Sequence, residues 1–293
     1  MKDRITKYLD EVNEKYVDEL YFKDFNNKFN RWIENVNDES DKKILCELLM
    51  NLKFFSRVEI KSELRKKIFE LKSSNDDFKE TIFIPLTPAQ GRYSGANEII
   101  QHIKEIDREE KIKESELLPY GDSIRTDIVH TIDISNLIIV DDISCTGGTV
   151  KKFINANSNL LEGKKVIIML LVVTDEALEF FDTLKKQYSN IQFEFTFCEK
   201  LDKLSSLKLL SSDQYNRLIS IEENLWGGKK EFVLGFKRSE LLVLFSHNIP
   251  NNTVSSFWFT SQHNPNKWVH LFKRITAPKR ESVNYRNKKR RNK

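Results

Sequence analysis

The stretch that decides the fold covers residues 137–149 and reads LIIVDDISCTGGT. Its first four residues are apolar and show no polar alternation, which is typical of a parallel strand buried on both faces. Asp141 and Asp142 follow directly, at the carboxyl end of the predicted strand. Open α/β sheets bind their ligands at that end. We therefore expect a central strand that presents two carboxylates to a binding site.

The second half of the stretch, TGGT at residues 146–149, supplies a turn whose backbone can approach a ligand closely. Glycine adopts positive φ at little cost, so its N–H group can face an anion, and the flanking threonine hydroxyls can donate hydrogen bonds. Residues 150–154, VKKFI, are typical of the start of a helix. A helix N-terminus adds unpaired N–H groups and partial positive charge. The turn therefore favours a phosphate ligand.

This combination of a buried strand, an acidic pair and a TGGT turn resembles the signature with which type I phosphoribosyltransferases bind 5-phosphoribosyl-1-pyrophosphate (PRPP). The resemblance implies that Asp141 and Asp142 are the catalytic acids and hold the ribose 2′- and 3′-hydroxyls. It also implies a Mg²⁺ cofactor held through the ligand, with the same two acids as its candidate protein contacts. The implied PRPP-binding turn comprises Ser144, Cys145, Thr146, Gly147, Gly148 and Thr149. The sequence contains neither a P-loop motif nor a GxGxxG motif.

A second strand, loop and helix precede this stretch. Residues 81–84, TIFI, predict a strand, residues 97–106 predict a helix, and the loop between them reads PLTPAQGRYSGA. In phosphoribosyltransferases the loop after the first core strand holds pyrophosphate, so the resemblance implies Arg92, Ser94 and Gly95 as pyrophosphate contacts. The loop is longer and richer in proline than its counterpart in that family. An ordinary surface loop is the alternative.

Strands and helices alternate through the middle of the chain. Residues 166–173, VIIMLLVV, are wholly apolar, and Thr174 is a candidate N-cap for the amphipathic helix that follows. The alternation predicts an α/β fold with a doubly wound parallel sheet of the type I phosphoribosyltransferase kind. We expect three parts: a helical module over residues 1–77, the α/β domain with a hood-like C-terminal region over residues 78–272, and a basic tail over residues 273–293.

Two regions outside the main motifs carry weaker signals. Phe25, Phe29 and Trp32 fall on one face of a predicted helix. We expect this aromatic stripe to pack against the α/β body, and a partner-binding face is the alternative. Residues 107–135 are charged and correspond in position to the flexible catalytic lid of related enzymes. Candidate lid residues are Lys111, Lys113, Arg125 and Asp127.

The predicted hood contains an aromatic run beside several turn-forming residues. By resemblance Trp258 is a candidate for the acceptor pocket, because phosphoribosyltransferases often hold the acceptor base by aromatic stacking. A buried aromatic cluster is the alternative for Trp258. His247, His263 and His270 have no metal-ligand spacing. We expect each histidine to be a surface or capping residue.

Composition limits the class of protein. With 293 residues, 39% of them hydrophobic and 31% charged, the chain can bury a sizeable core and is expected to be soluble and globular. No apolar run approaches the roughly 18 residues of a membrane span, and the N-terminus lacks a secretory signal. Cys46, Cys145 and Cys198 are widely spaced, which favours reduced thiols over disulfides or zinc. We therefore expect a cytoplasmic protein with no membrane partner.

The arrangement as a whole is similar to phosphoribosyltransferase-like effectors of bacterial conflict and anti-phage systems. Some of these effectors are paired with retron reverse transcriptases, so the resemblance implies a reverse transcriptase with its RNA or DNA as a partner. The residues that carry it are Phe83-Ile84-Pro85, Ser94-Gly95, Asp141-Asp142 with the Gly-Gly turn, Pro250-Asn251-Asn252-Thr253 and Phe257-Trp258.

Two functions stay open at this level. One is an enzyme that binds PRPP or a related ribose-phosphate nucleotide with Mg²⁺ and transfers at ribose C1′, onto a small acceptor or a nucleic acid. The other is a catalytically silent sensor or assembly subunit of the same fold that binds nucleotide or nucleic acid.

The basic tail provides a further candidate contact with nucleic acid. Residues 273–293 contain ten Lys or Arg and one Glu, so the tail carries +9 and the rest of the chain −5. Such a run favours polyanions, because binding releases counterions from the nucleic acid. The alternative is an extension that only improves solubility.

Deletion of residues 286–293 is expected to weaken nucleic acid binding at low salt, because the deleted segment carries six basic side chains. Fluorescence anisotropy with a labelled oligonucleotide at several salt concentrations measures the effect. Equal affinity of the truncated and full-length chains would leave the tail without a binding role.

Overall fold

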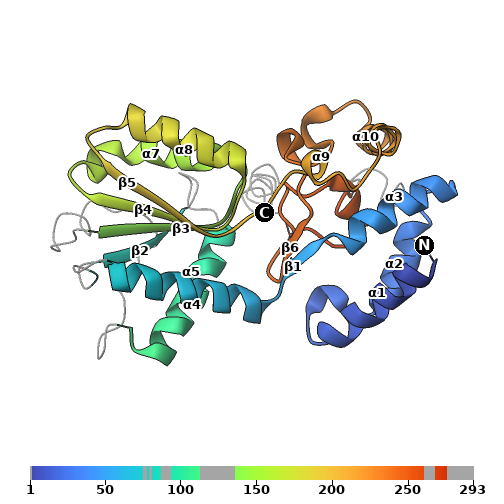
Figure 1. Cartoon of the computed structure of the whole chain (residues 1–293), viewed down its shortest axis with the longest axis horizontal. Coiled ribbons are helices and arrows are strands. Elements are labelled where there is room, and N and C mark those ends of the chain that lie inside the picture. Colours follow the sequence, from blue (N-terminus) through green and yellow to red (C-terminus); the bar gives the residue numbers. More distant parts are fainter. Residues whose placement is uncertain are drawn as a thin grey trace, which may run out of the picture.

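The computed structural model describes residues 2–74, 78, 81–86, 94–112, 136–260 and 268–275. Figure 1 shows two lobes, one built on a parallel sheet and the other on helices from both ends of the chain. Within the described residues, no helix is both long enough and apolar enough to cross a bilayer.

A four-stranded parallel sheet forms the core of the first lobe. The strands lie in the order β2 (Thr81–Pro85), β3 (Asn136–Ser144), β4 (Lys165–Val173) and β5 (Gln192–Lys200). Ile139 of β3 pairs with Ile84 on one side and Ile168 on the other. The apolar runs of β3 and β4 are buried on both faces, as expected for central parallel strands.

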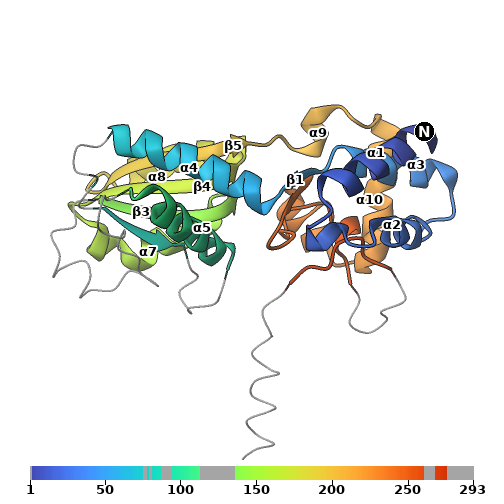
Figure 2. The ribbon, with the colours of Figure 1, turned by 90° about the horizontal axis from the view of Figure 1, so that it is seen from below.

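Helices cover both faces of this sheet. Ile138 and Val140 belong to the core under α4 (Arg57–Ser74) and α5 (Gly95–Glu110), whereas Leu137 and Ile139 belong to the core under α7 (Gly148–Leu161) and α8 (Asp175–Gln187). Figures 1 and 2 show the two helical layers on either side of the strands. The predicted doubly wound α/β fold is confirmed.

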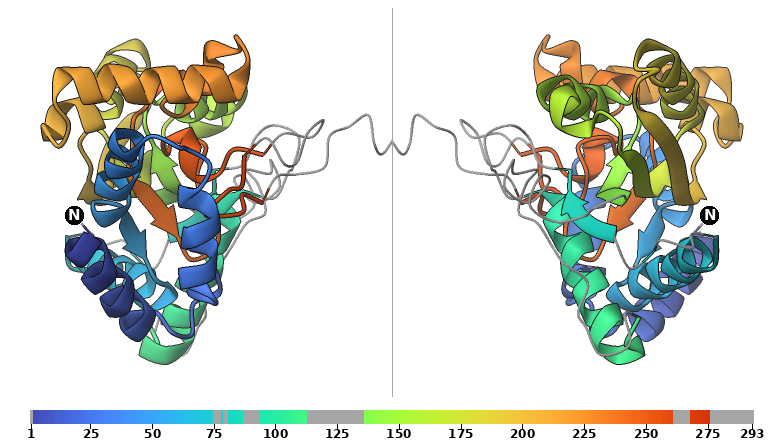
Figure 3. Two further views of the ribbon diagram at one scale, coloured as in Figure 1. Left: turned by 90° about the vertical axis from the view of Figure 1, so that its right-hand side faces the viewer. Right: turned by 90° about the vertical axis from the view of Figure 1, so that its left-hand side faces the viewer.

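The second lobe combines the first and last parts of the described chain. Its helices are α1 (Lys2–Lys15), α2 (Phe25–Ile33), α3 (Glu39–Met50), α9 (Leu204–Leu207) and α10 (Ser212–Trp226), with short 3-10 turns η1 (Leu20–Phe22), η3 (Lys230–Phe232), η4 (Phe236–Arg238) and η5 (Ser255–Phe257). Residues from 5–54 and 204–272 share one hydrophobic core. In Figure 3 the C-terminal segments lie between α10 and the N-terminal helices.

The aromatic stripe of α2 packs against the C-terminal hood and not against the sheet. The ring of Trp32 stacks on Phe257 with a centroid distance of 5.4 Å, and its Nε1 donates to the Ser256 carbonyl at 2.9 Å. This packing is explained by the sheet faces being already covered by α4, α5, α7 and α8. The division of the chain at residue 77 stays a prediction.

A short parallel pair of strands lies between the lobes (Figure 1). In this pair β1 (Lys53–Phe55) is aligned with β6 (Val243–Phe245), and the Ser246 N–H donates to the Phe55 carbonyl at 2.9 Å. Because β1 is followed almost immediately by α4, the pairing joins the hood to the sheet lobe.

A buried carboxylate organises the hood. Glu222 of α10 is fully buried and accepts hydrogen bonds from the Leu234 N–H, the Ser256 N–H at 2.7 Å and the Ser255 hydroxyl at 2.8 Å. Burial raises the pKa of Glu222, although these hydrogen bonds oppose the shift. The carboxylate thus ties α10 to segments on both sides of β6.

Glu222→Gln is expected to lower the free energy of unfolding by about 2 kcal/mol, because the new amide group faces N–H donors that need an acceptor. Glu223→Gln is the matched control, since its exposed side chain makes only a 3.5 Å ion pair with Lys230, and it is expected to cost less than about 0.5 kcal/mol. Urea denaturation measures both variants. Similar losses in the two would contradict a structural role for Glu222.

Candidate functional site

The candidate site lies at the carboxyl end of β3, where the sequence predicted it. Both acids belong to the strand, which continues as far as Ser144. Side chains alternate between the faces of a strand, so Asp142 shares the face of Val140, toward α5, and Asp141 shares the face of Ile139. The two acids therefore have different surroundings.

Asp141 is the buried member of the pair. Only 9% of the residue is exposed, and its Oδ1 accepts a hydrogen bond from the Asp142 N–H at 2.9 Å. Burial, and then the negative charge of Asp142, raise the pKa of Asp141 well above the usual value for an aspartate. Asp141 therefore fixes the local backbone, and its carboxyl group is protonated more readily than that of an ordinary aspartate.

Asp142 pairs with a histidine from the hood. Its Oδ2 lies 3.0 Å from Nε2 of His247, and the side chains are 15% and 7% exposed, respectively. The His247 ring stacks on Phe245 of β6 with a centroid distance of 5.3 Å and an interplanar angle of 9°. Its Nδ1 is buried and has no hydrogen-bond partner within the described residues. A carboxylate–histidine pair thus lies at the junction of the lobes.

The prediction of a surface or capping role for His247 was wrong. His247 reaches Asp142 only because β6 pairs with β1, and neither three-residue strand has a strong signal of its own. The apolar run at residues 241–245, just before His247, is the sequence signal that could have indicated a buried strand there. His270 lies in the hood with Nδ1 3.2 Å from the Thr260 hydroxyl, and His263 lies outside the described residues.

The N-terminus of α5 contacts the same acid. Gly95 begins this helix, and a Cβ atom built on it would lie 1.9 Å from Oδ2 of Asp142. Ser94 precedes it as the N-cap residue, and its N–H donates to Asn97 Oδ1 at 2.9 Å. The structure thus brings the predicted residues Ser94 and Gly95 beside Asp142. Arg92 lies outside the described residues.

The TGGT turn leads from β3 into α7. Gly147 is the N-cap residue of α7 with φ of +67°, and a Cβ atom there would lie 2.1 Å from the Phe180 ring. Glycine is therefore required on both conformational and steric grounds. The Thr174 hydroxyl donates to the Cys145 carbonyl at 2.6 Å, which ties the turn to the end of β4. The turn is thus held in a fixed conformation at a helix N-terminus.

Exposure divides the residues of the turn into two groups. Ser144, Cys145 and Gly147 are buried, whereas Thr146, Gly148 and Thr149 are accessible to solvent. Burial raises the pKa of the Cys145 thiol, so this side chain is a protonated structural group and not a nucleophile. The accessible part of the turn is the part that can meet a ligand.

The remaining predicted residues lie in the hood, at the end of α5 or outside the described chain. Trp258 is buried in the hood, where its Nε1 donates to the Thr253 carbonyl at 2.8 Å. Its role in an acceptor pocket stays a prediction. Arg274 lies 5.4 Å from the Trp258 ring. Lys111 is the C-cap residue of α5, and the other candidate lid residues Lys113, Arg125 and Asp127 lie outside the described residues.

The described part of the chain contains no group of three or more His, Cys, Asp or Glu side chains arranged to hold a metal ion. The oxygen donors of the candidate site are the carboxylates of Asp141 and Asp142. The first accepts a hydrogen bond from the Asp142 N–H, and the second contacts His247. Carboxylate oxygens suit Mg²⁺, which commonly keeps water and phosphate ligands and needs few protein ligands. This donor set fits a Mg²⁺ ion that arrives with a phosphorylated ligand.

Comparison with known proteins identifies a family for most of the chain. Residues 29–274 match the family model described as PRTase-CE. The match begins in α2 and extends through the sheet lobe to the hood, so it includes the acids, the turn and His247. No curated protein matches the sequence.

Gly95→Ala is expected to lower the free energy of unfolding by about 2 kcal/mol, because the methyl group must displace the Asp142 carboxylate. Gly148→Ala is the matched control, since Gly148 also begins a helix and its Cβ position has only Thr146 Oγ1 nearby, at 3.5 Å. We expect this control to be neutral or stabilising by up to about 1 kcal/mol. Thermal or urea unfolding that ranks the two variants in the reverse order would contradict the close approach of Gly95 to Asp142.

Proposed function

Because the chain belongs to the PRTase-CE family, a family of the phosphoribosyltransferase type, we propose that it binds PRPP or a related ribose phosphate with Mg²⁺ and transfers the phosphoribosyl group at C1′. One observation carries the proposal. The Asp142 carboxylate lies beside the N-terminus of α5 and a few residues before the turn that opens α7. An acid for sugar hydroxyls and two helix N-termini for phosphates are thereby close in the fold.

Each of these groups has a proposed role in binding the donor. The accessible backbone of Thr146, Gly148 and Thr149 receives the 5′-phosphate at the N-terminus of α7. Asp142 accepts hydrogen bonds from ribose hydroxyls, and Asp141 holds the backbone of Asp142 in place through the 2.9 Å hydrogen bond. The N-terminus of α5, with Ser94 and Gly95, lies on the pyrophosphate side. The strand end and the two helix N-termini that carry these groups are formed before the donor binds. Such preorganised groups stabilise developing charge without reorganisation.

The transfer breaks the bond between C1′ and pyrophosphate and forms a bond from C1′ to the acceptor atom. Positive charge develops on the ribose as pyrophosphate leaves, and Asp142 offsets it. Bound Mg²⁺ would neutralise charge on the leaving pyrophosphate. The acceptor loses a proton, and His247 is our candidate base. With Nε2–H donating to Asp142, Nδ1 is the ring nitrogen left to accept a proton, and it is buried and has no partner within the described residues.

Isothermal titration with PRPP and Mg²⁺ tests the binding step. The double variant Asp141→Asn, Asp142→Asn is expected to bind at least about tenfold more weakly than wild type, because charge-assisted hydrogen bonds to the ribose are lost. Asp182→Asn, an exposed aspartate of α8, is the control for the change in charge. No heat with wild-type protein, or equal affinity in the double variant, would reject the proposed donor site.

The alternative is a catalytically silent subunit that senses a nucleotide or assembles with other components. The burial of Asp141 and the pairing of Asp142 with His247 favour this alternative, because both acids already have partners. Pyrophosphate release in the presence of bases, nucleotides and RNA separates the two functions. Release that depends on Asp142 and His247 supports transfer, whereas PRPP binding without release supports the sensor.

A role as an effector of bacterial anti-phage defence, with a reverse transcriptase and its nucleic acid as partner, is part of the same proposal. It is supported by the sequence resemblance described above. The genes that neighbour the coding sequence, and co-purification of the chain with a reverse transcriptase, are the observations that test it.

A further inference from the structure

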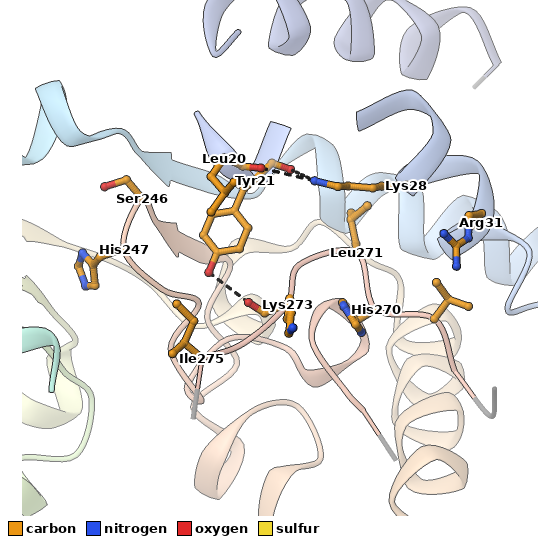
Figure 4. Close-up of a pocket in the computed structure, with 11 residues that line it drawn as sticks. Leu20, Tyr21, Lys28, Arg31, Ser246, His247, His270, Leu271, Lys273 and Ile275 are labelled. Atoms are coloured by element: carbon orange, nitrogen blue, oxygen red, sulfur yellow. Dashed lines mark hydrogen bonds between the residues drawn. The ribbon is translucent and has the colours of Figure 1, made fainter. Parts of the chain in front are cut away.

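A pocket of about 580 Å³ lies in the second lobe, with His247 on its wall. Its lining comes from η1, α2, the segment after β6 and the last described segment, as Figure 4 shows. The lining residues are Leu20, Tyr21, Lys28, Arg31, Ser246, His247, Val269, His270, Leu271, Lys273 and Ile275. The volume lies within the roughly 300–1,000 Å³ that is usual for small-molecule sites.

The charged side chains that line this pocket are all positive. Lys28, Arg31 and Lys273 line it, and among the described lining residues none carries a carboxylate. None of the three cations forms an ion pair within the described chain, and Lys28 instead donates to the carbonyls of Tyr21 at 3.1 Å and Leu20 at 3.5 Å. The pKa of His270 is lowered by burial and further by the positive charges of these three cations. The pocket therefore favours an anion.

The rest of the lining suits a planar apolar group. The Tyr21 ring is buried, and its hydroxyl donates to the Lys273 carbonyl at 3.2 Å, which fixes the ring in the pocket wall. Burial raises the pKa of Tyr21 to about 12, so the phenol adds no negative charge near neutral pH. Leu20, Leu271 and Ile275 supply aliphatic surface around it. An aromatic ring beside cations is the combination that binds a base together with a phosphate.

His247 connects this pocket with the candidate transfer site. His247 is one of the residues that line the pocket, and its Nε2 contacts Asp142. In Figure 4 its ring lies at the edge of the lining, turned away from Tyr21 and Lys273. Its buried Nδ1 has no partner in the described part of the chain. A group bound in the pocket is therefore next to the residue whose side chain pairs with the donor acid. We infer that the pocket binds a nucleoside phosphate, either free or at the end of a nucleic acid strand, and that this ligand is the acceptor.

The assignment as acceptor rests on the proposed transfer function, whereas the binding of a nucleoside phosphate does not. In the transfer, an oxygen or nitrogen of the bound nucleotide forms the bond to C1′, its proton passes to His247, and pyrophosphate leaves with the electron pair of the broken C1′–O bond. The sequence after Ile275 carries eight further Lys or Arg residues, a composition that favours polyanions such as nucleic acid.

Isothermal titration of the full chain tests the inference with ribonucleoside 5′-monophosphates, inorganic phosphate and a short 5′-phosphorylated oligonucleotide. The pocket variant Arg31→Gln, Lys273→Gln is expected to bind a monophosphate at least about tenfold more weakly than wild type, because two charge contacts are lost. The control Lys43→Gln, Lys186→Gln removes the same charge from exposed sites outside the pocket and should bind as wild type does. The PRPP affinity of the pocket variant should be unchanged.

The outcomes separate the two proposals and the two sources of the ligand. Monophosphate binding that depends on Arg31 and Lys273 supports the pocket even if PRPP does not bind, in which case only the transfer function fails. No binding to wild type, equal affinity in the pocket variant, or inorganic phosphate binding as tightly as a nucleotide would overturn the inference. Tighter binding of the oligonucleotide than of the monophosphate, with the same dependence on Arg31 and Lys273, identifies a strand end as the source.

Discussion

The parallel pairing of β1 with β6 is the constraint on which the two-lobed arrangement depends. The pair has only three residues on each strand, yet β1 leads into α4 of the sheet lobe and β6 leads into His247. The hydrogen bond from the Ser246 N–H to the Phe55 carbonyl extends the pair by one residue and sets the direction of the chain toward Asp142. Two segments from opposite ends of the sequence thereby complete one site.

The candidate site is therefore a composite of rigid elements. Asp142 ends a central strand, Gly95 begins a helix on one face of the sheet, and His247 follows a strand of the other lobe. Among the described loops, the TGGT turn contributes to the site, and the Cys145 carbonyl before it is fixed by Thr174. Sites supported in this way need little reorganisation when charge develops on a substrate. The pocket beyond His247 adds the positive charges of Lys28, Arg31 and Lys273, which come from the second lobe.

Local sequence patterns predicted the sheet lobe well, because its two central strands contain long apolar runs and its helices have clear starts. The stretch LIIVDDISCTGGT indicated the strand, the acids and the turn, and Thr174 caps α8 as expected, with its hydroxyl 3.4 Å from the Ala177 N–H. His247 and the pocket were not predicted. Their positions depend on contacts such as Trp32 with Phe257, between residues far apart in the sequence, which no local periodicity reports.

The shared core of the second lobe has a consequence for the order in which the protein assembles during translation. Helices α1 to α3 leave the ribosome before the side chains that cover Trp32, including Phe257, are synthesised. The sheet lobe lies between them in the sequence and, since domains fold largely as units, can form while the early helices still expose apolar faces. Completion of the second lobe, and with it the approach of His247 to Asp142, is therefore delayed until the hood has been made. A chain interrupted before the hood would keep the acids and the turn but lack the histidine.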